Sequence, residues 1–428
     1  MAVAIFVFSL FGFIFLGVPV AFAIVLCAIV LMYFIFGSLA DPMLIGQLVL
    51  HGTNNFPLMA IPFFVLAGEI MAKGGLSVRI VQFAKLAIGR IRGGLGYTSI
   101  MSSIVFSGLS GSAVADASAT GGILIPIMGE NGYNKALAAA LNCSSAIISA
   151  IIPPSIAFIL IGSTTGLSIT RLFMMGIVPG LIIGIAIMVR WFFIVRRDNY
   201  HDTIRFTKQE VKVILKDSIP VLFLPVIIIG GIRFGVFTPT EAAAFAVVYA
   251  LLISVFWYRE LKLSDVRKIF RSTLITTSAV MLIVGAASAV GFFITLAQLH
   301  LQISNLFGGL TDSPLLFLLG SMLFLLLIGM VVDATPLNLI FAPILIPIAI
   351  RAGINPYFYS LLLVLNLNIG LLTPPVGTIL FIGASIANVP VIEVIKKIIP
   401  FLATLIVVML LFVFFPQILI IPFNWLMG

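Results

Sequence analysis

Charged residues are scarce in this chain of 428 residues. Asp, Glu, Lys and Arg together make up 9% of the sequence, against about 25% in an ordinary soluble domain. A soluble fold of this size needs a charged shell, so the shortage excludes a soluble enzyme, a nucleic-acid-binding protein and a disordered chain. The net charge of +9 does not require an acidic partner, because Lys and Arg collect in the cytoplasmic loops of membrane proteins.

Cysteine and histidine are rarer still. The two cysteines, Cys27 and Cys143, lie far apart in apolar segments, which does not indicate a disulfide framework. The three histidines, His51, His201 and His300, have no metal-ligand spacing. The sequence therefore offers no cluster for a transition metal.

Apolar residues, by contrast, make up 62% of the chain. A membrane-spanning helix needs about 20 of them in a row, and the apolar runs leave room for roughly a dozen spans. The runs do not alternate with period two, which excludes a transmembrane β-barrel. The sequence predicts an all-α polytopic membrane protein.

An internal repeat organises the chain. Residues 122–162 align with 343–383 without gaps, at an offset of 221 and with 13 identities in 41 positions. The identities include three prolines, two glycines and one asparagine, which matched apolar composition alone would rarely produce. Each copy contains a Pro-Pro pair near its end, Pro153-Pro154 and Pro374-Pro375, and both copies end in a glycine.

Basic clusters set the orientation of the two halves when all are placed in the cytoplasm. They are Lys85 with Arg90 and Arg92, Arg196-Arg197 with Arg205 and Lys208, Arg259 with Lys262, Arg267 and Lys268, and Lys396-Lys397. The parity of crossings then predicts re-entrant hairpins at 98–128 and 314–350, broken spans at 136–163 and 356–388, and ordinary spans at 170–192 and 272–297. The two hairpins enter from opposite sides. The halves are thus inverted, as in many secondary transporters.

Proline and polar residues mark where these segments are interrupted. Pro126 and Pro347 lie in the returning arms of the hairpins, and the Pro-Pro pairs fall inside membrane-length runs. Two successive prolines should unwind a helix, and irregular backbone at that depth must face protein or a polar cavity. An ordinary proline kink is the alternative.

The hairpin tips are unusually polar. They read FSGLSGSAVADASAT from 106 to 120 and GMVVDAT from 329 to 335. Small residues also suit a helix-packing face, but carbonyl and hydroxyl oxygens at an unwound tip favour Na⁺. Folding each tip onto its break predicts two cation sites related by the repeat. The predicted residues of the first site are Ser107, Gly108, Ser112, Ser149 and Ser155. Those of the second site are Gly329, Asp333, Gly370 and Thr373.

Intramembrane carboxylates are functional candidates because they are costly to bury. Asp116 and Asp333 do not align in the repeat and lack a GxGD motif, which argues against an aspartyl protease. Helix capping is an equal alternative for Asp116, whereas Asp333 is the better cation ligand. Glu69 is placed to pair with Lys73, one turn away.

An organic anion is expected between the two cation sites, facing hairpin N-termini and hydroxyl groups. The predicted substrate-binding residues are Ser110, Thr335, Pro154, Pro375 and Thr378.

The motifs resemble a known family. The runs PFFVLAGEIMAKGG, GLSGSAVADASATGGILIPIM and TPTEAAA and the breaks IPPS and LTPPVG are similar to the large membrane (M) subunit of TRAP transporters, the tripartite ATP-independent periplasmic transporters. The resemblance covers essentially the whole chain and is strongest to the sialic-acid branch. It implies an elevator-type fold like that of the ion-transporter superfamily, and it adds the backbone of Val376 to the second Na⁺ site.

The resemblance also implies a division of labour along the chain. Scaffold helices are expected at 1–92, and the two halves of the transport domain at 93–169 and 314–390. Further scaffold helices with cytoplasmic loops are expected at 170–313, and a C-terminal scaffold helix at 391–428. The implied partners are a small four-helix membrane subunit (Q type) and a soluble periplasmic substrate-binding protein (P type), both separate chains, within a bacterial inner membrane.

The sequence thus predicts Na⁺-coupled import of an organic acid anion, with sialic acid as the expected substrate and at least two Na⁺ sites. The closest alternative is a C4-dicarboxylate transporter of the same family. An ion channel lined by the hairpins is less favoured because no filter sequence is evident. A membrane enzyme using Asp116 and Asp333, and a permease driven by an ATPase, complete the alternatives, and we expect no enzymatic activity.

Overall fold

The computed structural model describes residues 2–198, 200, 206–299, 302 and 313–427. Arg205, His201 and His300, which the sequence analysis named, lie outside these residues, as does part of the predicted segment 170–313. Within them the ordered elements are helical, as the all-α prediction requires.

Eight described helices or helix pairs are long and apolar enough to cross a membrane. The other apolar helices are shorter, because the hairpin arms and broken spans divide membrane-length runs into pieces. The helices that flank the repeat are α1 (Ala2–Phe15), α2 (Val20–Phe36), α3 (Pro42–Thr53), α4 (Ala60–Lys73), α5 (Leu76–Ile88), α10 (Ile169–Asp198), α11 (Lys208–Arg233), α12 (Pro239–Leu252), α13 (Leu263–Leu296), α19 (Val391–Phe414) and α20 (Gln417–Met427). Short turns join or extend some of them: η1 (Gly37–Leu39), η2 (Phe56–Met59) and the π-helical η4 (Ile253–Trp257).

Two helical hairpins lie at the positions that the sequence predicts. The first consists of α6 (Gly94–Ser110) and α7 (Ala113–Glu130), and the second of α15 (Pro314–Gly329) and α16 (Ala334–Arg351). The first tip is a two-residue turn in which Gly111 has a φ of +62°, a conformation that favours glycine. The bounds of α7 and α16 differ by the repeat offset of 221 at both ends.

Two broken spans follow the hairpins. The first is α8 (Lys135–Ala146) extended by η3 (Ile147–Ala150), then an irregular stretch, then α9 (Ile156–Thr165). The second is α17 (Pro356–Gly370) followed by α18 (Thr378–Ala387). Each break contains the expected Pro-Pro pair, and both pairs are joined by a cis peptide bond. Helix ends before each pair and begins again after it, at 150 and 156 in the first span and at 370 and 378 in the second, so the spans are interrupted, where a kink would only have bent them.

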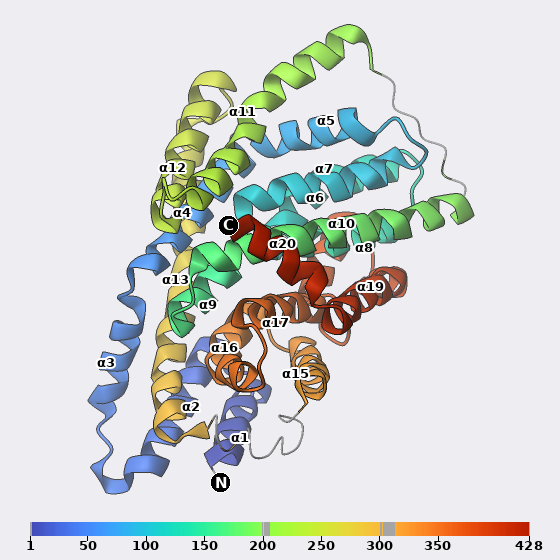
Figure 1. Ribbon diagram of the computed structural model, residues 1–428. Helices are drawn as coiled ribbons and strands as arrows, with labels where there is room; N and C mark the ends of the chain where they lie inside the picture. The colour runs from blue at the N-terminus through green and yellow to red at the C-terminus, as the bar shows by residue number, and fades with distance from the viewer. Residues whose placement is uncertain (1, 199, 201–205, 300–301, 303–312, 428) are drawn as a thin grey trace.

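The helices form two packed groups. The hairpins and broken spans pack on one another and on α10 and α19, which we call the hairpin bundle. The flanking group comprises α1–α4, α12 and α13, while α5 and α11 lie between α12 and the first hairpin. Figure 1 shows α3 and α13 side by side along one edge of the molecule.

The packing of α10 and α19 bears on the expected division into scaffold and transport helices. Helix α19 contacts α8, α18 and α10, and α10 contacts α6 and α9. By their contacts, both helices belong with the hairpin bundle. A scaffold role for 391–428 would instead place α19 with α1–α4, α12 and α13. The scaffold assignment concerns movement, and it stays a prediction.

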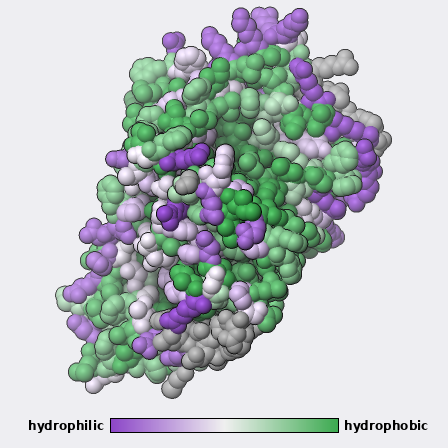
Figure 2. Space-filling model, in the orientation of Figure 1, coloured by the Kyte–Doolittle hydropathy of each residue, from purple (hydrophilic) through white to green (hydrophobic). Residues whose placement is uncertain are grey.

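Several basic ends of helices meet on one side of the molecule, which we call the basic side. Arg79 of α5 forms an ion pair of 2.5 Å with Glu260 and stacks over the ring of Tyr258. Arg92, just before α6, donates from Nε to the carbonyl of Tyr200 at 3.0 Å, beyond the end of α10. These contacts join the regions of three of the predicted basic clusters. Figure 2 shows broad hydrophobic areas, with hydrophilic side chains gathered at the upper and right-hand edges of this face.

The start of α12, in the run TPTEAAA, is capped by side chains. Thr238 Oγ1 accepts from the backbone N–H of Glu241 at 3.3 Å, and Glu241 Oε2 accepts from the N–H of Thr238 at 2.8 Å. This reciprocal arrangement is a capping box, and it satisfies two backbone donors that a helix start leaves free.

Candidate functional site

The first hairpin tip folds onto the first break, as the repeat alignment predicts. The backbone N–H of Ile156 donates to the carbonyl of Gly111 at 3.3 Å. A side chain on Gly111 would collide with the carbonyl oxygen of Pro154, 2.5 Å from an added Cβ. Ser112 and Ser155, which neighbour these residues, cap α7 and α9. The tip and the break therefore form one compact unit.

Asp116 lies one turn into α7 and is fully buried. Its Oδ2 accepts a hydrogen bond of 2.8 Å from the hydroxyl of Ser149, which lies in η3 next to the break. Its Oδ1 is buried and has no hydrogen-bond partner among the described residues. Helix capping, one interpretation of Asp116, is wrong, because Ser112 is the cap and accepts from the N–H of Ala115 at 3.4 Å. The carboxylate instead joins the hairpin to the broken span.

The other hydroxyls of the first predicted cation site make local bonds. Ser107 Oγ donates to the carbonyl of Ile104 at 2.5 Å, and Ser155 Oγ donates to the carbonyl of Ala150 at 2.6 Å. A hydroxyl that donates its proton to a carbonyl still has lone pairs available for a cation. Gly108 faces α11, where an added Cβ would lie 2.6 Å from Pro225 Cβ, so this glycine permits close packing of the hairpin.

The second predicted cation site is assembled mainly from backbone. Gly329 at the end of α15 lies against Gly370 at the end of α17, so closely that a Cβ on Gly370 would lie 2.7 Å from the carbonyl carbon of Gly329. Thr373 Oγ1 donates to the carbonyl of Ile369 at 2.7 Å. Asp333 caps α16 by accepting from the N–H of Thr335 at 2.9 Å. Val376 lies half-buried in the same break.

A cavity of about 220 Å³ lies between the two tips, and we call it the tip cavity. Ser112 and its successors at the start of α7 line it from one hairpin, and Asp333 and Thr335 at the start of α16 line it from the other. The first residues of α9 line it as well. Three helix N-termini thus border the cavity, and the partial positive charge of a helix N-terminus favours an anion.

The predicted substrate residues divide among several places. Thr335 lines the tip cavity and Ser110 lines an adjoining one. Pro154, Pro375 and Thr378 line neither. Pro154 is buried in the first break and Pro375 is exposed in the second, while Thr378 begins α18 with its hydroxyl buried and unpaired among the described residues.

Other residues of the tip cavity were missed by the sequence analysis. Asn338 of α16, Asn368 of α17 and Thr276 of α13 also line it. The two asparagines could have been found from the sequence, because amide side chains are rare within membrane-length apolar runs and tend to face the interior of the bundle. Of the described residues that line the cavity, none is basic and one, Asp333, is acidic.

The tip cavity adjoins a larger cavity toward the basic side. A second cavity of about 450 Å³, the basic-side cavity, shares Val65, Ser112, Val114, Ile156 and Thr276 with it. Glu69 and Lys73 of α4 line this second cavity. The expected pairing of these two residues is wrong, since Glu69 Oε1 instead accepts from the hydroxyl of Ser272 on α13 at 2.6 Å. The described ion pairs, Arg79–Glu260 and Arg197–Asp198, do not include Lys73.

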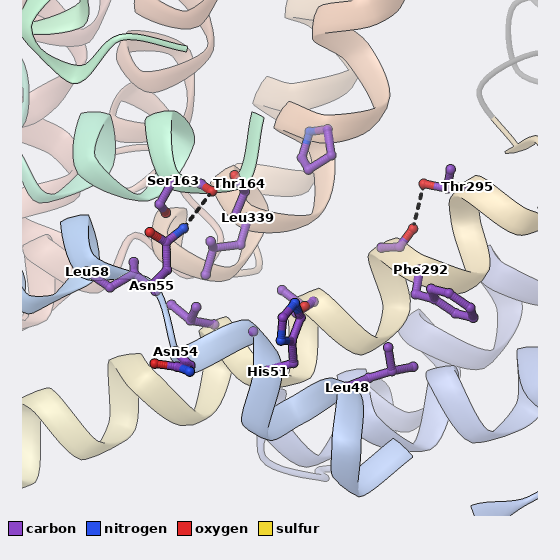
Figure 3. A pocket seen from close by; sticks show the side chains of 16 residues that line it. Leu48, His51, Asn54, Asn55, Leu58, Ser163, Thr164, Phe292, Thr295 and Leu339 are labelled. Carbon is purple, nitrogen blue, oxygen red and sulfur yellow. Dashed lines mark hydrogen bonds between the residues drawn. The ribbon is translucent and has the colours of Figure 1, made fainter. Parts of the chain in front are cut away.

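A third cavity, of about 480 Å³, opens between the flanking group and the hairpin bundle and shares no lining residue with the tip cavity. Figure 3 shows His51 on α3 beside α13, with the side chain of Asn55 reaching across to α9. Asn55 Nδ2 donates to the carbonyl of Ser163 at 3.2 Å. This hydrogen bond ties the two groups of helices together at the end of α9.

Comparisons with known proteins fit this architecture. The YdaH transporter of Alcanivorax borkumensis shares the fold, with a TM-score of 0.64 at 15% identity over 90% of this chain and 89% of that one. The 2,3-diketo-L-gulonate TRAP transporter large permease YiaN of Escherichia coli K12 is 41% identical over 100% of both chains. The sialic acid TRAP transporter large permease SiaM of Vibrio cholerae is 37% identical over 96% of both. The C4-dicarboxylate TRAP transporter large permease DctM of Pseudomonas aeruginosa is 35% identical, over 87% of this chain and 88% of that one.

The family model for the DctM component of tripartite ATP-independent periplasmic transporters matches residues 7–418. Together with the apolar helices, this match makes the protein a multi-pass transporter permease of a bacterial inner membrane, and not an enzyme. A permease of this kind works with a small membrane subunit and a periplasmic binding protein in the secondary transport of organic acids. The chain belongs to the DctM family of TRAP transporter large permeases.

Proposed function

We propose that the protein imports an organic acid anion coupled to Na⁺, by an elevator-type movement of the hairpin bundle. The observation that carries this proposal is the tip cavity, which lies between two tips that each fold onto a helix break. Carbonyl and hydroxyl oxygens at these two places are suited to Na⁺. The helix N-termini between them are suited to an anion.

Asp116 strengthens the case for a cation at the first site. Its buried carboxylate has one oxygen without a described partner and lies 2.8 Å from the hydroxyl of Ser149, a predicted ligand. A buried carboxylate is strongly destabilised unless a cation or a proton compensates its charge. Na⁺ bound at Ser107, Ser112, Ser149 and Ser155 would provide that compensation and hold the first tip against its break.

The substrate class that the cavity supports best is a hydroxylated monocarboxylate. Asn338, Asn368, Thr335 and Ser112 offer hydrogen bonds for hydroxyl groups, whereas no described residue of the tip cavity offers a positive charge for a second carboxylate. Sialic acid, the expected substrate, and diketogulonate, the substrate in the name of the relative from Escherichia coli, are both acids of this class. A C4-dicarboxylate is the alternative, favoured by the relative from Pseudomonas aeruginosa.

The conformation supports alternating access. The tip cavity shares five lining residues with the basic-side cavity and none with the cavity around His51. With the basic side in the cytoplasm, this arrangement corresponds to an inward-facing state. Movement of the hairpin bundle past α3, α4 and α13 would carry the tips toward the periplasm. There a binding protein of the P type would deliver the anion, with a four-helix subunit of the Q type supporting the flanking group.

The test is uptake into proteoliposomes that contain this chain with its small subunit, with the binding protein supplied outside. Labelled sialic acid, diketogulonate and succinate are each tested with and without an inward Na⁺ gradient. We expect uptake of a hydroxylated monocarboxylate that needs both the gradient and the binding protein. Uptake of succinate alone would correct the substrate class, and uptake indifferent to Na⁺ would refute the coupling.

A further inference from the structure

The basic-side cavity contains a positive charge that the transport scheme does not yet use. Lys73 ends α4 and lines this cavity together with the hydroxyl-bearing residues Ser110, Ser112, Ser118 and Thr276. The cavity of about 450 Å³ is roughly twice the size of the tip cavity at 220 Å³, which it adjoins through five shared lining residues. It is therefore placed to receive an anion that leaves the tips toward the basic side.

Lys73 has no carboxylate partner among the described residues. Its natural partner, Glu69, lies one turn earlier on the same helix, but the carboxylate of Glu69 is bonded to the hydroxyl of Ser272. The described ion pairs lie elsewhere, and the side chain of Lys73 is exposed. An ammonium group that has no ion-pair partner at the wall of a cavity is available to an anionic ligand.

The route between the two cavities follows regular helix faces. On α13, Ser272 and Thr276 lie one turn apart, Thr276 lines both cavities, and Ser272 holds Glu69. On α4, Val65 lines both cavities, and Glu69 and Lys73 follow at successive turns. Residues four apart lie on one side of a helix, so α4 and α13 form a continuous wall that runs from the tips to Lys73.

We propose that Lys73 forms a carboxylate-binding site on the cytoplasmic side, which receives the substrate anion as it leaves the tip cavity. The Ser272 hydroxyl keeps the Glu69 carboxylate from neutralising Lys73, and the hydroxyl of Thr276 completes the site. This inference rests on the proposed import of an organic anion, and it adds a second binding step to it. The site belongs to the flanking group, so the substrate is handed from the hairpin bundle to α4.

Counterflow measures affinity on the cytoplasmic side directly. Proteoliposomes are loaded with graded concentrations of unlabelled anion, and entry of the labelled anion is followed. Binding protein is supplied only outside, so the measurement selects transporter molecules whose cytoplasmic side faces the lumen. For Lys73→Gln we expect the half-saturating lumenal concentration to rise roughly threefold to fivefold, the scale of one partly exposed ion pair. Lys73→Arg should restore it, and the dependence on external binding protein should not change.

Lys216→Gln is the matched control, because Lys216 is an exposed lysine near the basic end of α11 that lines none of the described cavities. An unchanged lumenal affinity in Lys73→Gln, or an equal change in Lys216→Gln, would overturn the proposal.

A labelling experiment tests the site without requiring transport. Cys27 and Cys143 are both buried, so an introduced thiol reacts on a low background. In nanodiscs, Ala72→Cys, which lines the same cavity beside an intact Lys73, is treated with an anionic methanethiosulfonate reagent in the presence of N-acetylneuraminate, diketogulonate or succinate. We expect at least one anion to slow labelling there, and none to slow it in Lys216→Cys or when Lys73→Gln is added to Ala72→Cys. If no anion slows labelling at Ala72→Cys, the site is refuted, whereas absent Na⁺-driven uptake in the unmodified protein refutes the proposed function instead.

Discussion

The two halves of the repeat place the same elements in the same order but build their tip-to-break contacts from different chemistry. In the first half, a side-chain bond adds to the backbone contact at Gly111, since Ser149 donates to a buried carboxylate, Asp116. In the second half, the position equivalent to Ser149 is Gly370, which lies directly against the backbone of Gly329. At this pair of equivalent positions, the first half uses a hydroxyl and a charge, and the second half requires the absence of a side chain.

The breaks also differ in how they are covered. Residues 151–155 of the first break are all buried, whereas Pro375 in the second is exposed. The duplicated architecture therefore repeats the position of the proposed cation sites, whereas the local residues differ in how deeply they are buried. The two halves should respond differently to matched substitutions.

The largest effect is expected from a single methyl group in the second half. In Gly370→Ala the added Cβ lies within 2.8 Å of three backbone atoms of Gly329, and backbone cannot yield as a side chain can. We expect a loss of roughly 1 to 3 kcal/mol in stability, seen as a lower melting temperature of the purified complex, with loss of Na⁺-driven uptake. Gly329→Ala is the control, because its Cβ meets atoms at 3.4 Å or more. Equal melting temperatures for the two variants would contradict the backbone contact.

Removing the buried charge tests the first half. Asp116→Asn keeps the size of the side chain and an oxygen for Ser149, so the protein should fold. We expect the half-saturating Na⁺ concentration for uptake to rise roughly tenfold, equal to about 1.4 kcal/mol. Asp333→Asn, which preserves the cap of α16, should raise it less, because Asp333 is only partly buried. A larger effect at Asp333 would place the more demanding cation site in the second half.

Single hydroxyls should matter less than the charge. Ser112→Ala removes the cap of α7 and costs about 1 kcal/mol of stability. Thr373→Ala removes a hydroxyl bonded to the carbonyl of Ile369 in the last turn of α17, and that carbonyl keeps its bond from the N–H of Leu372. We expect both to raise the half-saturating Na⁺ concentration by roughly threefold to fivefold, and only Ser112→Ala to lower the melting temperature. Unchanged Na⁺ dependence in either variant would remove that residue from its site.

The smallest expected effect concerns the bond that ties the first half to the flanking group. Asn55 bonds to α9, the second part of the first broken span. Among the described residues, no hydrogen bond joins the equivalent helix of the second half, α18, to α3, η2 or α4. Asn55→Ala removes one neutral hydrogen bond, worth about 1 kcal/mol, and should shift the population toward the outward-facing state by up to about fivefold. Spin labels at Leu50→Cys and Thr165→Cys would report this as a changed distance distribution. An identical distribution would mean that the bond does not bias the equilibrium.

Much of the fold follows from sequence features with a clear physical cause. The hairpins, the broken spans and the cap at Thr238 were predictable because proline, glycine and capping residues act locally. The repeat offset of 221 carried these assignments from one half to the other. The packing of α19 against the hairpin bundle could not be predicted, because its apolar residues do not indicate which neighbours cover them.

The sites were predictable only in part. Alignment brought tip and break together correctly, but it gave no role to Asn338 or Asn368, whose partners depend on helix rotation. It also paired Glu69 with Lys73 from their spacing, whereas Ser272, distant in sequence, takes the carboxylate. Long-range competition for a hydrogen bond is not encoded in the spacing of two residues on one helix.

The close fit of α10 over the first break has a practical consequence. A Cβ on Gly176 would collide with the carbonyl of Ile151, and one on Gly180 with the side chain of Ile152. The first break therefore packs closely against α10, and in the proposed elevator movement the two would move together. A fluorophore at Arg196, near the exposed end of α10, would then report the position of the proposed first cation site in single molecules without altering a ligand.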